Sequence, residues 1–364
     1  MSEYILVLIW LAVAGLISIE IPKQKMKFGD KIEYRYPIWW AIIIMLPIIF
    51  WAGTREYIGD TYVYAGNFQS MPQQVGEIAT YMSGITKDKG FSFFSVLIKI
   101  FITSDKTIYF CILAAIQGII LVRLYRKYSL EYVTSIFLFI ASTDYISWMY
   151  NGIRQFTAVT ITVLAFEWVL KKKYMQAILI ILLASLFHKS ALIMLPFIFI
   201  CQGKAWNKKT LLFIGLIIIA VAGIEKFTGV LDTVLAETQY KNVVSDWQSF
   251  QDDGTNILRV LVYVVPTILA FLGRKKINRE NDTIISYCVN MSLISAGFYI
   301  VSIFTSGIFI GRIPIYFSLY NYILLPWEIK NIFEKRSVIM MRIFMILGYL
   351  AFYYYSMHCS WNFI

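Results

Sequence analysis

The chain has 364 residues, of which 59% are apolar and only 15% are charged. Soluble globular domains are about half apolar and about a quarter charged, so this composition excludes a water-soluble enzyme or a nucleic-acid-binding module and indicates an integral membrane protein. In so apolar a chain, the net charge of +11 is explained by basic cytoplasmic loops.

Apolar segments along the chain predict an all-α, polytopic membrane protein of about 12 helices. A helix needs about 20 apolar residues to cross the hydrocarbon core, and several of these segments are shorter. They cover residues 4–19, 38–53, 106–124, 130–149, 153–170, 174–188, 189–203, 210–225, 257–273, 283–304, 313–327 and 338–356. We expect residues 1–364 to form a single transmembrane domain.

Two longer polar segments, 54–105 and 225–256, interrupt this series and are predicted to be outer loops. The first is a large loop that follows the second helix. Within it, residues 91–101 (FSFFSVLIKIF) are too short to span a membrane and predict an amphipathic helix on the outer surface. Partial burial of this helix against the bundle is the alternative.

The distribution of lysine and arginine predicts the orientation. Six loops carry 22 of the 33 basic residues: 20–37, 123–131, 171–173, 204–209, 274–282 and 328–342. The positive-inside rule assigns these loops to the cytoplasm. Both termini and both long polar segments are then expected outside the cytoplasm.

Residues 174–203 could form one long helix or two short helices that meet near His188. One long helix would reverse the orientation of everything that follows and place the later basic loops outside. The two-helix arrangement is therefore favoured. Non-helical backbone at such an apex needs protein or a water-filled cavity around it.

Basic residues near the predicted outer face are candidates for function, because the positive-inside rule disfavours them there. They are Arg55, Arg154, His188, Arg259 and Arg312. A single arginine at a helix end commonly extends to the lipid headgroups, which is the alternative for each. Because guanidinium groups bind phosphate oxygens bidentately, a cavity that the four arginines share would suit a diphosphate.

Polar and aromatic neighbours extend this set. Asp60 and Tyr64 follow Arg55 in the pattern R-x-x-x-x-D-x-x-x-Y. Asp60 could orient an arginine or accept a proton, and a solvated turn is the alternative. Tyr150 precedes Arg154 and could stack on a sugar ring, although interfacial aromatic belts explain most such residues.

No metal or cofactor site is expected. The four cysteines are isolated in or beside apolar runs and show no metal-binding spacing, and the chain has only two histidines. Glu167 lies one helical turn before Lys171 and is expected to pair with it.

Three sequence blocks resemble the EpsG family of Wzy-type polysaccharide polymerases. They are G-T-R-x-x-x-G-D-x-x-x-Y at 53–64, N-G-I-R-Q at 151–155 and L-F-H-K-S-A-L at 186–192. The resemblance covers most of the chain. It implies a GT-C-like bundle in the bacterial cytoplasmic (inner) membrane. Its activity would be inverting glycosyl transfer at the outer face, lengthening an exopolysaccharide, capsule or O-antigen from repeat units on undecaprenyl diphosphate, without metal.

The resemblance also implies roles for the matching residues. The active-site set would be Arg55, Asp60, Arg154, Gln155 and His188, with Tyr64, Tyr150 and Asn151 beside it. Arg312 fits an arginine that such families carry late in the chain, and Arg259 is added from the predicted topology. We expect Arg154 and Arg312 to bind the diphosphate, and Arg55 either to pair with Asp60 or to join them. His188 is the favoured general base and Asp60 the alternative.

The expected ligand is an undecaprenyl-diphosphate-linked oligosaccharide in contact with membrane lipid. A chain-length regulator and a flippase are the expected protein partners, and no nucleic acid is expected. Two other functions stay open. A flippase or transporter of the same lipid-linked units would distribute charges through both leaflets and show internal repeats. An O-antigen-type ligase would differ only in its acceptor.

Overall fold

The structure is a computed structural model that describes residues 3–28, 31–56, 58–235, 255–361 and 363. These residues are mostly helical, with one short β-hairpin among them, which confirms the all-α class. They divide into two compact units, one formed by residues 1–195 with 353–364 and the other by residues 196–352. Most of the predicted outer segment 225–256 lies outside the described residues.

The first unit contains the N-terminal half of the elements. They are α1 (Glu3–Ile17), β1 (Gln24–Phe28), β2 (Lys31–Arg35), α2 (Ile38–Thr54), α3 (Thr61–Ser70), η1 (Val75–Glu77), α4 (Ile78–Ser83), α5 (Lys89–Phe101), α6 (Lys106–Tyr128), α7 (Tyr132–Ala141), η2 (Tyr145–Asn151), α8 (Ile153–Val163), α9 (Ala165–Leu170), α10 (Tyr174–Phe187), η3 (Lys189–Ile193) and η6 (Ser356–Ser360). The hairpin of β1 and β2 was not expected from the sequence.

The division between the units falls within α11 (Met194–Ile200). The second unit continues with α12 (Lys208–Ala222), α13 (Ile224–Leu235), α14 (Ile257–Leu272), α15 (Arg274–Glu280), α16 (Thr283–Ile303), η5 (Ile310–Arg312), α17 (Ile315–Ser318), α18 (Asn321–Ile332) and most of α19 (Lys335–Tyr355).

The apolar helices make this a multi-pass membrane protein. Among the described residues, four helical segments are long and apolar enough to cross a membrane, or up to six if two bent pairs each form one span. The four are Lys106–Tyr128, Ile153–Leu170, Thr283–Ile303 and Lys335–Ser360. Other predicted spans are shorter helices; residues 130–149, for example, divide into α7 and η2. The number of 12 spans and the GT-C-like arrangement stay predictions.

Helices α2, α6, α8 with α9, and α10 pack in sequence within the first unit, α2 on α6, α6 on α8 and α8 on α10. Helix α6 runs parallel to α8 and α9, since Gln117 bonds Thr157 and Arg123 pairs with Glu167. Helices α2 and α10 run in the opposite direction, so the unit has two ends. At one end, Arg126 Nε donates a hydrogen bond to the carbonyl of Tyr36 (2.7 Å), and Arg35 Nε donates one to that of Lys127 (3.3 Å). This end, called the basic end below, also carries residues 171–173.

The chain breaks at His188, as the two-helix alternative for residues 174–203 predicted. Helix α10 ends at Phe187, His188 is extended (φ −158°, ψ 122°), and the short 3₁₀ turn η3 follows. Because α10 begins at the basic end, His188 lies at the opposite end of the unit, called the site end below. The turn η3 packs against α8 there.

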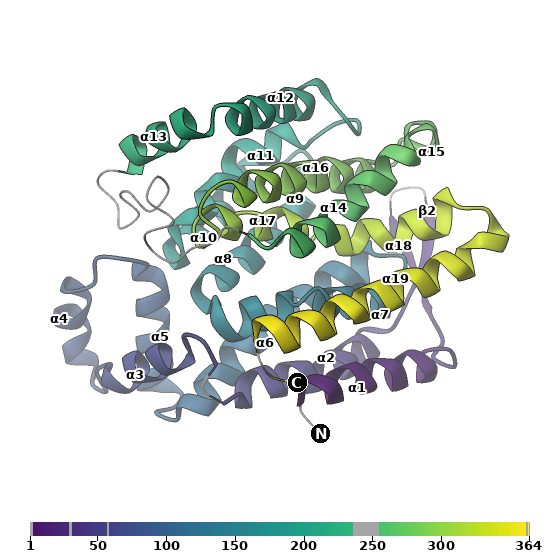
Figure 1. Cartoon of the computed structure of the whole chain (residues 1–364). Helices are drawn as coiled ribbons and strands as arrows, with labels where there is room; N and C mark the ends of the chain where they lie inside the picture. Colours follow the sequence, from purple (N-terminus) through teal and green to yellow (C-terminus); the bar gives the residue numbers. More distant parts are fainter. Residues whose placement is uncertain (1–2, 29–30, 57, 236–254, 362, 364) are drawn as a thin grey trace. The chain divides into compact units, whose positions relative to one another are not determined.

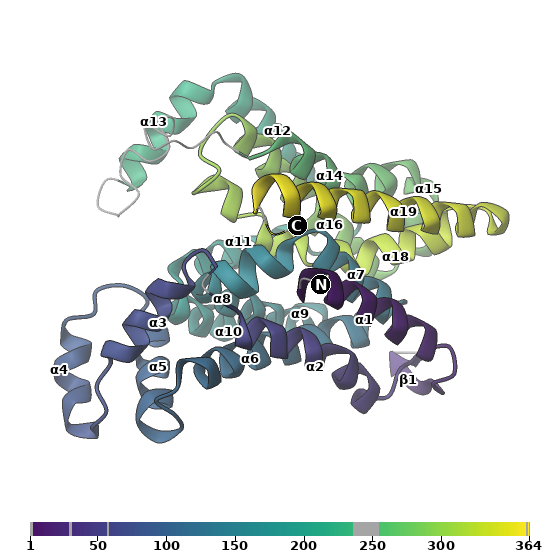
Figure 2. The same cartoon turned by 60° about the horizontal axis from the view of Figure 1, so that its bottom comes forward.

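Helices α3, α4 and α5 form a small group at the site end (Figure 1), and the rotated view shows the same grouping (Figure 2). The buried face of α5 includes Phe91, Val96 and Ile98, which join a core with Phe68 of α3 and Tyr109 of α6. The rings of Phe68 and Tyr109 stack with their centroids 4.0 Å apart. This core anchors the segment after α2 to the helix bundle.

Candidate functional site

Arg55 ends α2 as a buried cation, with only 7% of its surface exposed. Its Nε donates a hydrogen bond to Thr61 Oγ1 (3.2 Å), and its Nη1 donates one to the carbonyl of Ala52. The guanidinium carbon lies 4.2 Å from the ring centroid of Phe110 and 5.5 Å from that of Tyr150. Its Nη2 is buried without a hydrogen-bond partner. Burial lowers the pKa of Arg55 to about 10, so the group is charged at neutral pH.

The stacking of Arg55 on Phe110 depends on a close approach of α2 to α6. A Cβ at Gly53 would lie 2.3 Å from Cys111 Sγ and 2.7 Å from its Cα. Only glycine fits this contact, and small residues let membrane helices approach in this way. Arg55, two residues further on, therefore reaches the ring of Phe110.

Asp60 and Asn151 join the first two sequence blocks. The backbone N–H of Asp60 donates a hydrogen bond to Asn151 Oδ1 (2.9 Å). Gly59 has φ +51°, and a Cβ there would lie 2.3 Å from the same oxygen. The side chain of Asp60 is exposed. Among the described residues no carboxylate pairs with Arg55, so the expected pairing of Arg55 with Asp60 is wrong, and Thr61 takes that place.

The turn before Arg154 is the π-helix η2, which holds Tyr150 in the buried core. Tyr150 Oη lies 3.2 Å from Tyr145 Oη, and Tyr145 Oη donates a hydrogen bond to the carbonyl of Ile48 in α2 (2.6 Å). The Tyr150 carbonyl accepts from Thr61 Oγ1 (3.4 Å). Single π-helical turns frequently occur at functional sites.

Arg154 and Gln155 open α8 at the same end of the unit. Arg154 Nη1 lies 2.9 Å from Asp88 Oδ2, and its guanidinium carbon lies 5.8 Å from the ring centroid of Tyr64. Gln155 is buried. Sequence reasoning missed Asp88, and also Phe110, because nothing in either local sequence indicates an arginine partner.

His188 is half-buried, and its Nδ1 lies 2.6 Å from Ser190 Oγ. The Ser190 hydroxyl thus holds one ring nitrogen and fixes the orientation of the imidazole. The structure therefore brings the site residues predicted between 55 and 188 to the site end of the first unit.

Arg259 and Arg312 belong to the second unit, in α14 and η5. The N–H of Thr255, one turn before Arg259, donates a hydrogen bond to the carbonyl of Ser302 (2.9 Å). A Cβ at Gly311, next to Arg312, would lie 2.5 Å from Thr255 Oγ1. The segments that carry these two arginines thus meet at the C-terminal end of α16. A cavity shared by all four arginines stays a prediction.

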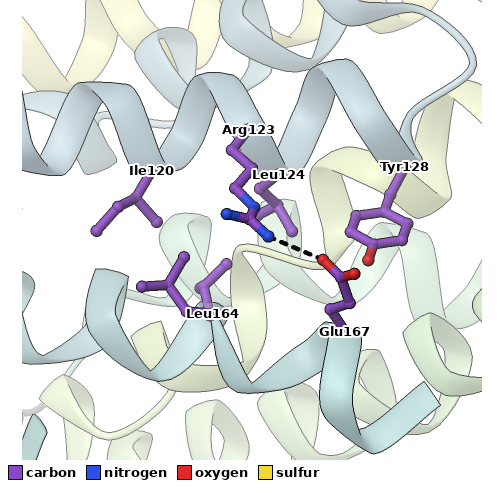
Figure 3. A pocket seen from close by; sticks show the side chains of 7 residues that line it. Ile120, Arg123, Leu124, Tyr128, Leu164 and Glu167 are labelled. Atoms are coloured by element: carbon purple, nitrogen blue, oxygen red, sulfur yellow. Dashed lines mark hydrogen bonds and ion pairs between the residues drawn. The ribbon is translucent and has the colours of Figure 1, made fainter. Parts of the chain in front are cut away.

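A pocket lies at the basic end of the first unit. It is lined by Ile120, Arg123, Leu124, Tyr128, Val163, Leu164 and Glu167 (Figure 3). Glu167 pairs there with Arg123 (2.9 Å), Lys127 (2.8 Å) and Lys171 (2.7 Å). The predicted pair of Glu167 and Lys171 is confirmed. Because three cations neutralise one carboxylate, we interpret this cluster as structural.

The part of the chain that the structure describes contains no group of three His, Cys, Asp or Glu side chains that could hold a metal ion. The candidate site instead combines guanidinium groups, buried phenol rings, one histidine and one exposed carboxylate. This combination can bind an anionic ligand and, through His188 or Asp60, accept a proton.

No curated protein and no solved structure matches the chain. The model of the EpsG family matches residues 38–362, nearly the whole chain, including all three sequence blocks. EpsG is a family of Wzy-type polymerases, which indicates a polysaccharide polymerase of the glycosyltransferase type in a membrane. On this match and on the apolar helices described above, the chain belongs to the EpsG family.

Proposed function

We propose that this protein polymerises a cell-surface polysaccharide from repeat units carried on undecaprenyl diphosphate. It transfers the growing glycan from its lipid diphosphate to a lipid-linked repeat unit by metal-independent, inverting glycosyl transfer. The reaction takes place at the outer face of the bacterial cytoplasmic membrane. The family supports the polymerase activity, and the chemistry of the site end supports the donor.

The observation that carries this proposal is the state of Arg55. A buried guanidinium with no carboxylate partner is costly, yet Arg55 keeps one buried nitrogen without a hydrogen-bond partner. An anionic ligand would satisfy that nitrogen and compensate the buried charge. Arg154 opens α8 at the same end of the unit, and two guanidinium groups suit a diphosphate.

The reaction needs two kinds of group. The bond between the anomeric carbon and the diphosphate breaks as the acceptor hydroxyl attacks from the opposite face, which inverts the configuration. Arg55 and Arg154 stabilise the charge on the departing diphosphate through preorganised electrostatics. The proton of the hydroxyl passes to His188, which Ser190 orients, or to Asp60.

The test is to incubate the purified full chain with synthetic lipid-diphosphate repeat units and to separate the products by size. A ladder of products longer than one repeat unit is the expected result. Movement of the units across proteoliposome membranes without elongation would indicate a flippase. Transfer of a single unit to an added glycolipid, with no ladder, would indicate a ligase.

A companion measurement tests the residues. Arg154→Ala and His188→Ala should each shorten the polymer and lower its yield. If both variants keep full polymer length and yield, these residues do not perform the reaction.

A further inference from the structure

An ion pair joins Arg154 of the candidate site to Asp88, a residue that lies outside the three sequence blocks. Asp88 Oδ2 lies 2.9 Å from Arg154 Nη1. The Asp88 side chain is only 10% exposed, whereas that of Arg154 is 41% exposed. The carboxylate is thus the sheltered partner and the guanidinium the accessible one. A charge-assisted hydrogen bond of this kind fixes the orientation of a guanidinium.

The backbone of Asp88 indicates that its side chain is directed to Arg154 and not to its own helix. Asp88 precedes α5 in the left-handed region (φ +48°), which Asp and Asn tolerate better than most residues. An Asp before a helix usually accepts hydrogen bonds from the first turn, but Asp88 makes no such bond. Asp105, before α6, does so with the N–H groups of Thr107 and Ile108.

The start of α5 also packs directly on the end of α10. A Cβ at Gly90 would lie 2.8 Å from the carbonyl oxygen of Leu186, two residues before His188. The rings of Phe94 and Phe187 lie 5.8 Å apart between centroids. The segment that carries Asp88 is therefore fixed against the chain that leads into the His188 turn.

We propose that Asp88 is a positioning residue, which orients Arg154 toward the diphosphate and couples this orientation, through the start of α5, to the His188 turn. Asp88 acts through Arg154 and does not itself touch the ligand. This inference rests on the proposed function, because it assigns Asp88 a role in the same site. It adds a residue that lies outside the sequence blocks of the family.

Two variants of the full chain test the proposal. Asp88→Asn removes the charge and keeps both size and tolerance of the left-handed backbone. Asp88→Gly removes the side chain and still allows the left-handed backbone conformation at this position. It replaces the first variant in the test if Asp88→Asn folds poorly. Asp105→Asn is the matched control, because that side chain caps a helix and touches no arginine of the site.

The primary measurement is calorimetric binding of inorganic pyrophosphate to the detergent-solubilised protein, which needs no turnover. Both Asp88 variants should weaken binding about tenfold or more, the loss expected when a charge-assisted contact is broken. Asp105→Asn should bind as the wild type does. In an Arg154→Ala background, Asp88→Asn should change binding less than about twofold, because coupled residues are not additive.

Four outcomes would overturn the proposal. Unchanged binding in both Asp88 variants would remove its basis, and so would a wild type that does not bind pyrophosphate. Tighter binding would show that Asp88 competes with the anion for Arg154. A full further loss in the Arg154→Ala background would show a scaffold role that is independent of Arg154. A wild type that binds pyrophosphate but forms no ladder would contradict only the polymerase.

Discussion

The side-chain oxygen of Asn151 accepts a hydrogen bond from the backbone N–H of Asp60, although 91 residues separate the two. This bond joins the block that follows α2 to the block that precedes α8. The Arg55 side chain also contacts this junction, because Thr61 Oγ1 accepts a hydrogen bond from Arg55 Nε and donates one to the carbonyl of Tyr150. The two blocks therefore form one structural element, and a change in either should disturb the other.

Gly59→Ala should damage this junction. The added Cβ would meet Asn151 Oδ1 at 2.3 Å, and φ is +51°, so we expect a loss of about 1–3 kcal/mol in the free energy of unfolding together with a reduced polymer yield. Gly66→Ala is the control, because that Cβ meets nothing within 4 Å in helix α3 and should stabilise by about 0.5–1 kcal/mol. Thermal unfolding in detergent compares the two; equal midpoints would contradict the prediction.

Arg55→Lys should lower polymer yield about tenfold or more, although it keeps the positive charge. Lysine lacks the planar group that stacks on Phe110 and supplies fewer fixed donors, so it is not a conservative replacement at a stacked site. Arg123→Lys is the control, since that side chain is exposed at the basic end. A full ladder from Arg55→Lys would show that charge alone suffices.

His188→Gln should reduce the rate of polymerisation about 100-fold, the lower range for loss of a general base. Ser190→Ala should have a smaller effect, because the imidazole ring loses the hydroxyl that fixes its orientation but the base itself is kept. His358→Gln is the matched control, since the other histidine is exposed and stacks on Tyr354. Initial rates with the lipid-linked repeat decide the case, and a normal rate for His188→Gln would transfer the role to Asp60.

Glu167→Gln should lower stability and leave the site unaffected. The three cations around Glu167 would lose their counter-charge. Because two of them are more than half exposed, we expect the free energy of unfolding to fall by only about 1–2 kcal/mol. The unfolding temperature should fall, while pyrophosphate binding stays at the wild-type value. Weaker pyrophosphate binding would mean that the basic end and the site end are coupled.

Introduced cysteines can test the predicted orientation. In a background with Cys111→Ser and Cys359→Ser, in which the remaining Cys201 and Cys288 are buried, a cysteine at exposed Tyr62 should react with a membrane-impermeant maleimide added to intact cells. A cysteine at exposed Lys173 should react only after the membrane is opened. The reverse pattern would place the candidate site on the cytoplasmic side and contradict the proposed use of an outer-leaflet substrate.

Much of the first unit could be predicted from the sequence, because the positions of charged residues along the chain can be read directly from it. Lysines and arginines mark the loops of the basic end, and the structure joins residues 35–36 to 126–127 there. The break at His188 was predicted from the same distribution of basic residues, because one long helix would have placed the later basic loops outside. Helix lengths were less predictable, because an apolar run such as 130–149 does not reveal where it divides into α7 and η2.

The candidate site was predictable where its residues are unusual for their surroundings, as an arginine is near an apolar helix end. Its partners were not. Asp88 lies in the charged stretch TKDKG and looks like a solvated loop residue, and only the tertiary packing of α5 on α10 places it beside Arg154. The pairing of Arg55 with Asp60 was wrong because five residues of separation do not determine which way a turn directs its side chains.

The π-helical turn η2 makes the length of this stretch as important as its composition. A π-helical turn holds one residue more than an α-helical turn, and each residue advances a helix by about 100°. Deleting a single residue from Tyr145–Asn151 would remove the wide turn, and the residues of this stretch could then no longer all reach their partners in the segment 48–61. The contacts of Asn151 with Asp60 and of Tyr150 with Thr61 would then be lost even where the deleted residue makes neither of them. Evolution of this segment should accept substitutions more readily than changes in its number of residues.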